Sequence, residues 1–125
     1  MIMPRTQTDP NDRIAQMPFA SVYPHYVSKV ERKGRSVEEL HTVIEWLTGF
    51  NSKKIEKLIE AKVTFKDFFH EAKLNAAAHI IKGNICGYRV EDITNPLIQK
   101  VRYLDKLVDE LAKGKHIDKI IRTSG

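Results

Sequence analysis

The most constraining feature of this 125-residue sequence is an apolar stripe near its C-terminal end. Asn95 is suited to cap a helix there, Pro96 to occupy its first position, and Gly114 to end it. Between them, apolar residues recur at spacings of four and three, the period of one buried helix face. These residues are Leu97, Val101, Leu104, Val108 and Leu111. The sequence therefore predicts a longer C-terminal helix near residues 96–113. Since the stripe lasts only about two heptads, it indicates a bundle helix rather than a coiled coil.

Similar patterns predict shorter helices upstream. The first is expected from about Ser21 to Lys33, and the second begins with a capping box formed by Ser36 and Glu39. Gly49 is expected to end this second helix, and Asn51 or Ser52 to cap a third. Thr64 can cap a fourth helix, and Asn75 a fifth that runs from Ala76 to about Ile85. A short last helix is predicted at Ile117–Ile121. Residues 87–93 are the one stretch with extended character. The predicted fold class is all-α, a compact bundle of about five to seven short helices.

The polar beginning of the chain predicts a separate segment. Residues 1–17 contain Pro4 and Pro10 and few apolar side chains, which favours a flexible N-terminal arm. Residues 18–125 are predicted to form a single helical domain, because 42% of the chain is apolar and its length is typical of one domain.

Four blocks of the sequence resemble the bacterial DUF2200 family. They are FASVYP at 19–24, EWLTG at 45–49, ICGYRVE at 85–91 and RYLDKLVDELAKG at 102–114. The resemblance extends over about residues 17–122. It implies a cytoplasmic prokaryotic protein of unknown function, with no established activity, cofactor or catalytic residue to transfer.

Cysteine content and hydropathy favour a cytoplasmic location. The single cysteine, Cys86, has no internal partner for a disulfide, which is typical of a reducing compartment. The sequence has neither an apolar run long enough to span a membrane nor the apolar stretch of a signal peptide. A cytoplasmic protein is therefore expected.

No pattern in the sequence predicts catalysis. His79 lies seven residues before Cys86, about 10 Å along a continuous helix, so a buried and inert thiol is expected. His70 and Glu71 begin a zinc-protease motif, but Leu74 stands where its second histidine is required. We therefore expect no catalytic residues, no cofactor and no bound metal.

A non-enzymatic protein-interaction module is the favoured hypothesis, with a protein partner or a second copy bound by apolar helix faces. The aromatic residues that motivate it are Trp46, Phe50, Phe65, Phe68 and Phe69. A candidate binding surface is also predicted where an irregular stretch meets the last long helix, comprising Tyr88, Arg89, Glu91, Arg102 and Tyr103. The alternative for Arg89 is an ion pair that locks the loop.

The alternative function is nucleic-acid binding, because the formal net charge is +5. Candidate phosphate contacts cluster at the end of the first helix, Lys29, Arg32, Lys33 and Arg35, and on the helix after Gly49, Lys53, Lys54 and Lys57. The two helices joined at Gly49 have the spacing of a helix-turn-helix, but Glu56 and Glu60 intervene, so an ordinary helical hairpin is favoured.

Overall fold

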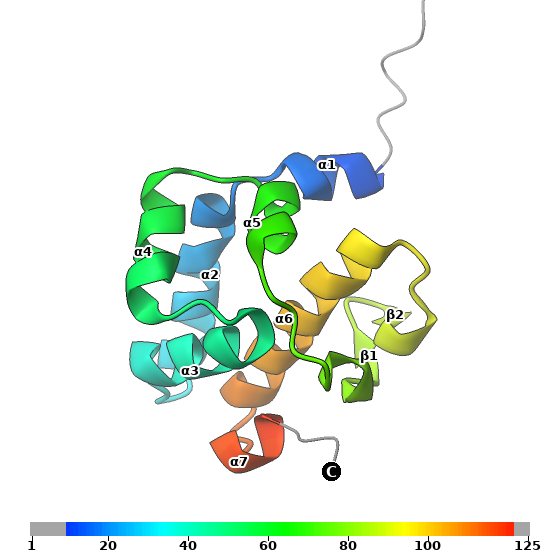
Figure 1. Cartoon of the computed structure of the whole chain (residues 1–125). Coiled ribbons are helices and arrows are strands. Elements are labelled where there is room, and N and C mark those ends of the chain that lie inside the picture. The colour runs from blue at the N-terminus through cyan, green and yellow to red at the C-terminus, as the bar shows by residue number, and fades with distance from the viewer. Residues whose placement is uncertain (1–9, 122–125) are drawn as a thin grey trace, which may run out of the picture.

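The computed structural model describes residues 10–121, which form a mostly helical fold (Figure 1). Its seven α-helices are α1 (Pro10–Gln16), α2 (Phe19–Glu31), α3 (Val37–Thr48), α4 (Ser52–Glu60), α5 (Phe65–Glu71), α6 (Pro96–Ala112) and α7 (Ile117–Ile120). Between α5 and α6 lie a 3₁₀ turn (Ala78–Ile80), a hairpin of β1 (Asn84–Ile85) and β2 (Tyr88–Arg89), and a second 3₁₀ turn (Val90–Asp92). The predicted helical class is confirmed. None of the helices within these residues is both long and apolar enough to cross a bilayer.

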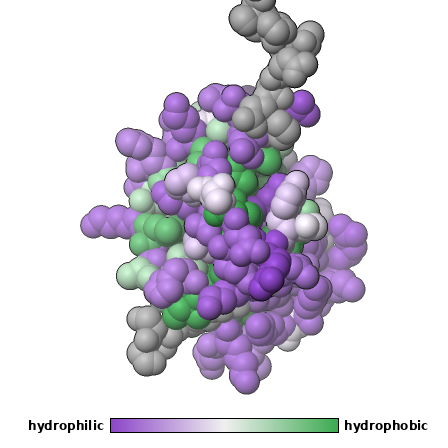
Figure 2. All heavy atoms as spheres, turned by 90° about the vertical axis from the view of Figure 1, so that its right-hand side faces the viewer, coloured by the Kyte–Doolittle hydropathy of each residue, from purple (hydrophilic) through white to green (hydrophobic). Residues whose placement is uncertain are grey.

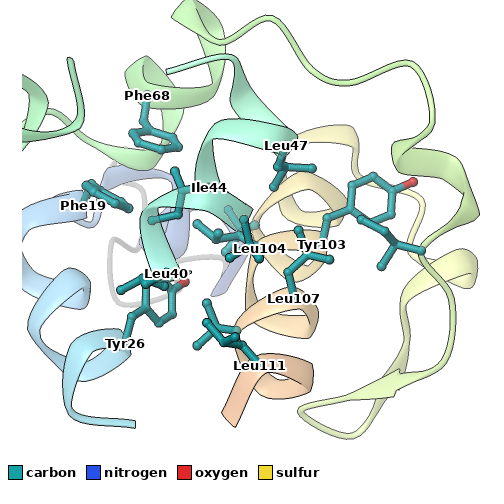
Figure 3. Packing of buried hydrophobic residues seen from close by; sticks show 14 of the residues in the cluster. Phe19, Tyr26, Leu40, Ile44, Leu47, Phe68, Tyr103, Leu104, Leu107 and Leu111 are labelled. Carbon is teal, nitrogen blue, oxygen red and sulfur yellow. The ribbon is translucent and has the colours of Figure 1, made fainter. Parts of the chain in front are cut away.

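Helix α6 is the centre of the fold. It packs against α1, α2, α3, α5 and α7 and against the hairpin (Figure 1). Its inward face is fully or almost fully buried, at Val101, Leu104, Leu107, Val108 and Leu111. Figure 3 shows this face meeting Leu40, Ile44 and Leu47 of α3. The predicted helix at 96–113 is thus confirmed to within one residue.

Phenylalanines fill the other half of the core. The rings of Phe19 and Phe68 stack with their centroids 4.3 Å apart, and Phe65 meets Phe19 edge-on at 6.0 Å. Two backbone bonds bring these segments together, from the Phe19 amide to the Val63 carbonyl (2.8 Å) and from the Phe65 amide to the Met17 carbonyl (2.9 Å). The start of α2 is therefore fastened to the start of α5.

Four of the caps identified in the sequence are present in the structure. Ser36 and Glu39 form the reciprocal capping box of α3, and Asn51, Thr64 and Asn95 each accept backbone amides at the starts of α4, α5 and α6. Gly49 ends α3 with a φ of 80°, in the left-handed region that favours glycine.

The prediction of a flexible arm over residues 1–17 is wrong for its last part. Residues 10–16 form α1, which packs against α5 and α6, with Ile14 touching the core. This tertiary contact stabilises a segment whose composition is too polar to order by itself. Residues 1–9, the rest of that prediction, lie outside the described residues.

The first predicted helix is displaced by two residues. It runs over Phe19–Glu31 rather than Ser21–Lys33, so Ser21 lies inside its first turn and Pro24 inside its second. Pro18 occupies the position before the helix with extended backbone (φ −66°, ψ 135°). Burial of Phe19 at this end outweighs the local capping preference of Ser21.

The predicted helix over Ala76–Ile85 is wrong. Backbone and side-chain bonds hold its start to the end of α3, because Asn75 gives its amide hydrogen to the Leu47 carbonyl (2.9 Å) and its side-chain Nδ2 to Trp46 (3.0 Å). Only one 3₁₀ turn follows before Gly83, whose φ is 110°. The extended character predicted for 87–93 is limited to β2, which pairs with β1.

Candidate functional site

The 84–89 hairpin presents an aromatic side chain to solvent. Asn84 pairs with Arg89 and Ile85 with Tyr88, leaving Cys86 and Gly87 as the two turn residues. Both have positive φ, 51° and 84°, as a tight two-residue hairpin requires. Ile85 points into the core, whereas Tyr88 is 60% exposed. Tyrosine is one of the residues enriched in the cores of protein interfaces.

A cleft of about 550 Å³ lies between this hairpin, α1 and the first half of α6. Its apolar lining comes from three isoleucines, Ile14, Ile93 and Ile98, with Tyr88 at its edge. The polar lining is Asn11, Arg89, Asp92, Thr94, Asn95 and Arg102. Figure 2 looks at this side of the molecule and shows hydrophobic residues surrounded by hydrophilic ones.

Arg102 lines the cleft, and its guanidinium is hydrogen-bonded to Asp105 on the same helix. Its Nη1 donates to Asp105 Oδ2 (2.7 Å) and lies 3.5 Å from the Cys86 sulfur. Asp105 also accepts the Tyr26 hydroxyl at 2.7 Å, and burial, reinforced by this carboxylate, raises the pKa of Tyr26 well above its ordinary value. Arg102 Nε is buried and has no acceptor among the described residues. The guanidinium is therefore anchored through Nη1, while its buried Nε–H is left without an acceptor.

Arg89 forms the predicted locking contact and also borders the cleft. Its Nη2 donates to Glu91 Oε2 at 3.1 Å, and Asp92 lies 3.9 Å away. Glu91 Oε1 accepts the Gly83 amide at 2.9 Å, and this backbone bond, with help from Arg89, lowers the pKa of Glu91. The position of Arg89 is thus compatible with both hypotheses, an ion pair that locks the loop and a contact residue of a binding surface.

Four of the five residues predicted as a binding surface lie together, and Tyr103 does not. Arg102 faces the cleft, but the next residue along a helix points about 100° away. Tyr103 is only 6% exposed and belongs to the core, where burial raises its pKa. The predicted surface is therefore reduced to Tyr88, Arg89 and Arg102, with Glu91 behind them.

A second, more open hollow of about 480 Å³ adjoins the cleft. The two share Asn11 and Asn95, at the point where α1 crosses the start of α6. Lys66 of α5, His70 of α5 and Lys100 of α6 line this hollow, together with the carboxylate of Asp12. Neither lysine forms an ion pair with any residue of the described chain.

Three of the seven predicted phosphate contacts are engaged by carboxylates. Lys29 pairs with Asp109 (3.2 Å), Arg35 with Glu39 (2.9 Å), and Lys54 with Glu71. Burial by itself would raise the pKa of Asp109, but Lys113 and Lys29 lower it overall. The remaining four, Arg32, Lys33, Lys53 and Lys57, are exposed and form no ion pair with residues 10–121.

The expectation of a buried Cys86 is wrong. The cysteine is exposed, because the segment that was expected to continue as a helix turns back as a hairpin at that residue. Nor are the phenylalanines available to a partner. Phe50, Phe65, Phe68 and Phe69 are at most 6% exposed, and Trp46 is partly buried. Their burial removes them as a reason to expect an apolar docking face.

A hydrogen-bonded chain of three side chains was not anticipated from the sequence. His41 Nε2 lies 2.6 Å from the Tyr23 hydroxyl, and His41 Nδ1 lies 2.8 Å from the Ser52 hydroxyl. These residues come from α3, α2 and α4, so their meeting depends on tertiary packing and no local motif announces it. Burial lowers the pKa of His41, which favours the neutral imidazole. These hydrogen bonds link α2, α3 and α4 at a position away from the cleft.

The acidic and sulfur-bearing side chains of the described residues do not gather into a metal site. No three His, Cys, Asp or Glu residues between 10 and 121 lie close enough together to share one ion.

Comparisons with known proteins give a family and a related structure. Residues 13–122 match the family model described as "Uncharacterized protein conserved in bacteria (DUF2200)". The crystal structure of "uncharacterized protein SP1917" is 42% identical in sequence and superimposes with a TM-score of 0.83, covering 88% of this chain and 91% of that chain. A comparison with curated proteins finds no match.

Proposed function

This chain belongs to the DUF2200 family of uncharacterised bacterial proteins, and we propose that it is a non-enzymatic interaction module that binds a segment of a partner protein. The binding site is the cleft between α1, the hairpin and α6. Its partner inserts an apolar side chain between Ile14, Ile93 and Ile98 while Tyr88 packs over that side chain. A cytoplasmic location is part of the proposal, supported by the exposed, unpaired thiol of Cys86.

The observation that carries this proposal is the exposure of Tyr88. Among the described residues, Met17 and Tyr88 are the large apolar side chains that are exposed, and Tyr88 is much the more exposed of the two, at 60% against 36%. Tyrosine combines a large contact area with few rotatable bonds, so ordering it in a complex costs little entropy. Its position beside the three isoleucines of the cleft gives a partner side chain two apolar surfaces to bury at once.

Rigid support favours the same site. The hairpin is closed by its two-residue turn, Glu91 fastens the following loop to Gly83, and the Tyr26–Asp105–Arg102 bonds fix the wall of the cleft. A preformed site loses less conformational entropy on binding than a mobile one.

Peptide selection tests the proposal without a known partner. The full chain is immobilised and a random peptide library is displayed against it; the selected peptides are then titrated into ¹⁵N-labelled protein. We expect amide shifts centred on residues 87–95 and 11–14, and at least about tenfold weaker binding by Tyr88→Ala, as for an aromatic residue that carries much of the binding energy. Met17→Ala, which removes the other exposed apolar side chain, is the matched control and leaves the affinity unchanged. Selected peptides that shift another face would overturn the assignment.

Nucleic-acid binding is less well supported. Carboxylates already neutralise Lys29, Arg35 and Lys54, so part of the positive charge is unavailable to phosphates. Fluorescence anisotropy of labelled DNA and RNA at low and physiological salt distinguishes the two functions. Tight binding that weakens steeply with salt would replace the protein-interaction proposal, since phosphate contacts release counterions.

A further inference from the structure

We propose that the partner segment carries an acidic residue close to its apolar anchor and that Lys66 and Lys100 bind this residue. The inference rests on the proposed function and specifies the chemistry of the partner. It follows from the hollow that adjoins the cleft at Asn11 and Asn95.

The two hollows offer different electrostatics. In the cleft, Arg89 and Arg102 are already paired with carboxylates, Glu91 and Asp105, so an incoming acidic group would have to compete with them. In the adjoining hollow, Lys66 and Lys100 have no carboxylate partner in residues 10–121, and Asp12 is the acidic group among the lining residues. The two lysines of the hollow, which outnumber its one carboxylate, are thus not engaged in ion pairs with any described residue, whereas the two arginines of the cleft are.

The helical geometry of α6 places these features within reach of one short segment. Leu97 and Lys100 line the hollow, whereas Ile98 and Arg102 line the cleft. Residues three or four apart share a helix face, so the two pairs occupy neighbouring faces of the same turns. A chain lying across the start of α6 therefore meets the apolar cleft and the two lysines within a few residues.

Lys66 and Lys100 come from different helices, which sets the geometry of the acidic group. Helices α5 and α6 pack against each other, and α1 packs against both. The lysine side chains consequently approach the hollow from two sides, which suits a carboxylate that projects from a bound chain. Because both ammonium groups are near the surface, their contribution is screened by salt.

The test uses two synthetic peptides of matched shape. The acetylated and amidated heptapeptides EEGLGEE and QQGLGQQ share the leucine anchor, and acidic residues on both sides make the first independent of chain direction. Each is titrated into the ¹⁵N-labelled full chain. We expect EEGLGEE to bind about tenfold more tightly at low salt, the scale of two exposed ion pairs, and the difference to shrink at high salt.

Charge-matched variants assign the effect. In the double variant Lys66→Gln with Lys100→Gln, the two peptides should bind with equal affinity. Lys53→Gln with Lys57→Gln removes the same charge from exposed lysines of α4 that form no ion pair within residues 10–121, and should keep the preference. If the Lys66/Lys100 double variant still prefers EEGLGEE over QQGLGQQ, the assignment of the acidic group to these lysines is overturned. The same holds if both double variants lose the preference equally.

The outcomes also separate this inference from the proposed function. Equal binding of both peptides at residues 87–95 overturns the acidic preference and leaves the apolar cleft as the site. Failure of both peptides to shift these amides, together with an empty library selection, overturns the interaction module itself. A labelled oligothymidylate that binds through Lys66 and Lys100 more tightly than EEGLGEE would assign the hollow to nucleic acid instead.

Discussion

His41 makes the stability of the fold depend on pH. Burial lowers its pKa, although the carboxylates of Glu56 and Glu38 act in the opposite direction. The hydroxyl groups of Tyr23 and Ser52 can both accept hydrogen bonds from an imidazolium, so the cost of protonation is the burial of a charge rather than the loss of these bonds. The unfolded chain takes up a proton near pH 6.5, where the folded chain resists it.

The contribution of neutral His41 to the free energy of unfolding should therefore be complete above about pH 6.5. It should decrease as the pH drops below that value and level off below the folded-state pKa of His41. We expect the melting temperature of the wild type to decline more steeply between about pH 7.5 and pH 5 than that of His41→Gln, which cannot titrate. Calorimetry at a series of pH values measures both slopes. Parallel slopes would show that His41 does not contribute to the acid sensitivity.

The exposed thiol of Cys86 gives a second prediction for a single residue. As the sole cysteine of the chain, it should react with a disulfide reagent in the native protein at the rate of an accessible thiol and to one equivalent. Cys86→Ser should change the free energy of unfolding by less than about 0.5 kcal/mol, because an exposed side chain of similar size is replaced. A thiol that reacts only in denaturant would contradict the hairpin geometry.

Among the helices and strands, the start of α6 depends on one side chain. Asn95 Oδ1 accepts the amides of Leu97 (3.0 Å) and Ile98 (3.1 Å), two donors that would otherwise lack a helical partner. Asn95→Ala should lower the free energy of unfolding by about 1 kcal/mol, whereas Asn95→Asp, which also caps and suits the helix dipole, should preserve it. Urea denaturation of the three proteins measures the difference, and equal losses for both variants would point to a role other than capping.

The elements that the sequence predicted correctly are those defined by local bonds. The caps at Ser36, Asn51, Thr64 and Asn95 act within three residues, so their effect does not depend on the rest of the fold. The failures occur where distant contacts prevail. Asn75 looked like a helix cap, but its backbone and side chain bond to the end of α3, almost thirty residues earlier.

The same distinction applies to the candidate site. Tyr88, Arg89 and Arg102 were predicted because the irregular stretch around Tyr88 was expected to pack against the last long helix. The sequence did not show which face of that helix is turned outward, so Tyr103 was included although it lies in the core. The contribution of α1 was missed entirely, because a polar segment with prolines gives no sign that Ile14 will pack against the bundle.

For the whole molecule, the fold and the proposed binding surface use different residues. Leu104 is fully buried at the centre of α6, the helix that packs against α1, α2, α3, α5 and α7. Leu104→Ala removes apolar contacts and leaves a cavity, so the free energy of unfolding should fall by about 3 to 5 kcal/mol. This loss is a large share of the stability that a domain of this size usually has.

Tyr88→Ala should instead leave the free energy of unfolding within about 0.5 kcal/mol of the wild-type value, because most of that side chain is in solvent before the substitution. Urea denaturation of both variants, followed by titration with a selected peptide, tests the separation. The Leu104→Ala variant should bind normally under conditions in which it is folded, whereas Tyr88→Ala should be folded and bind at least about tenfold more weakly. If Tyr88→Ala were as unstable as Leu104→Ala, the tyrosine would have a structural role, and its exposure would no longer argue for a binding partner.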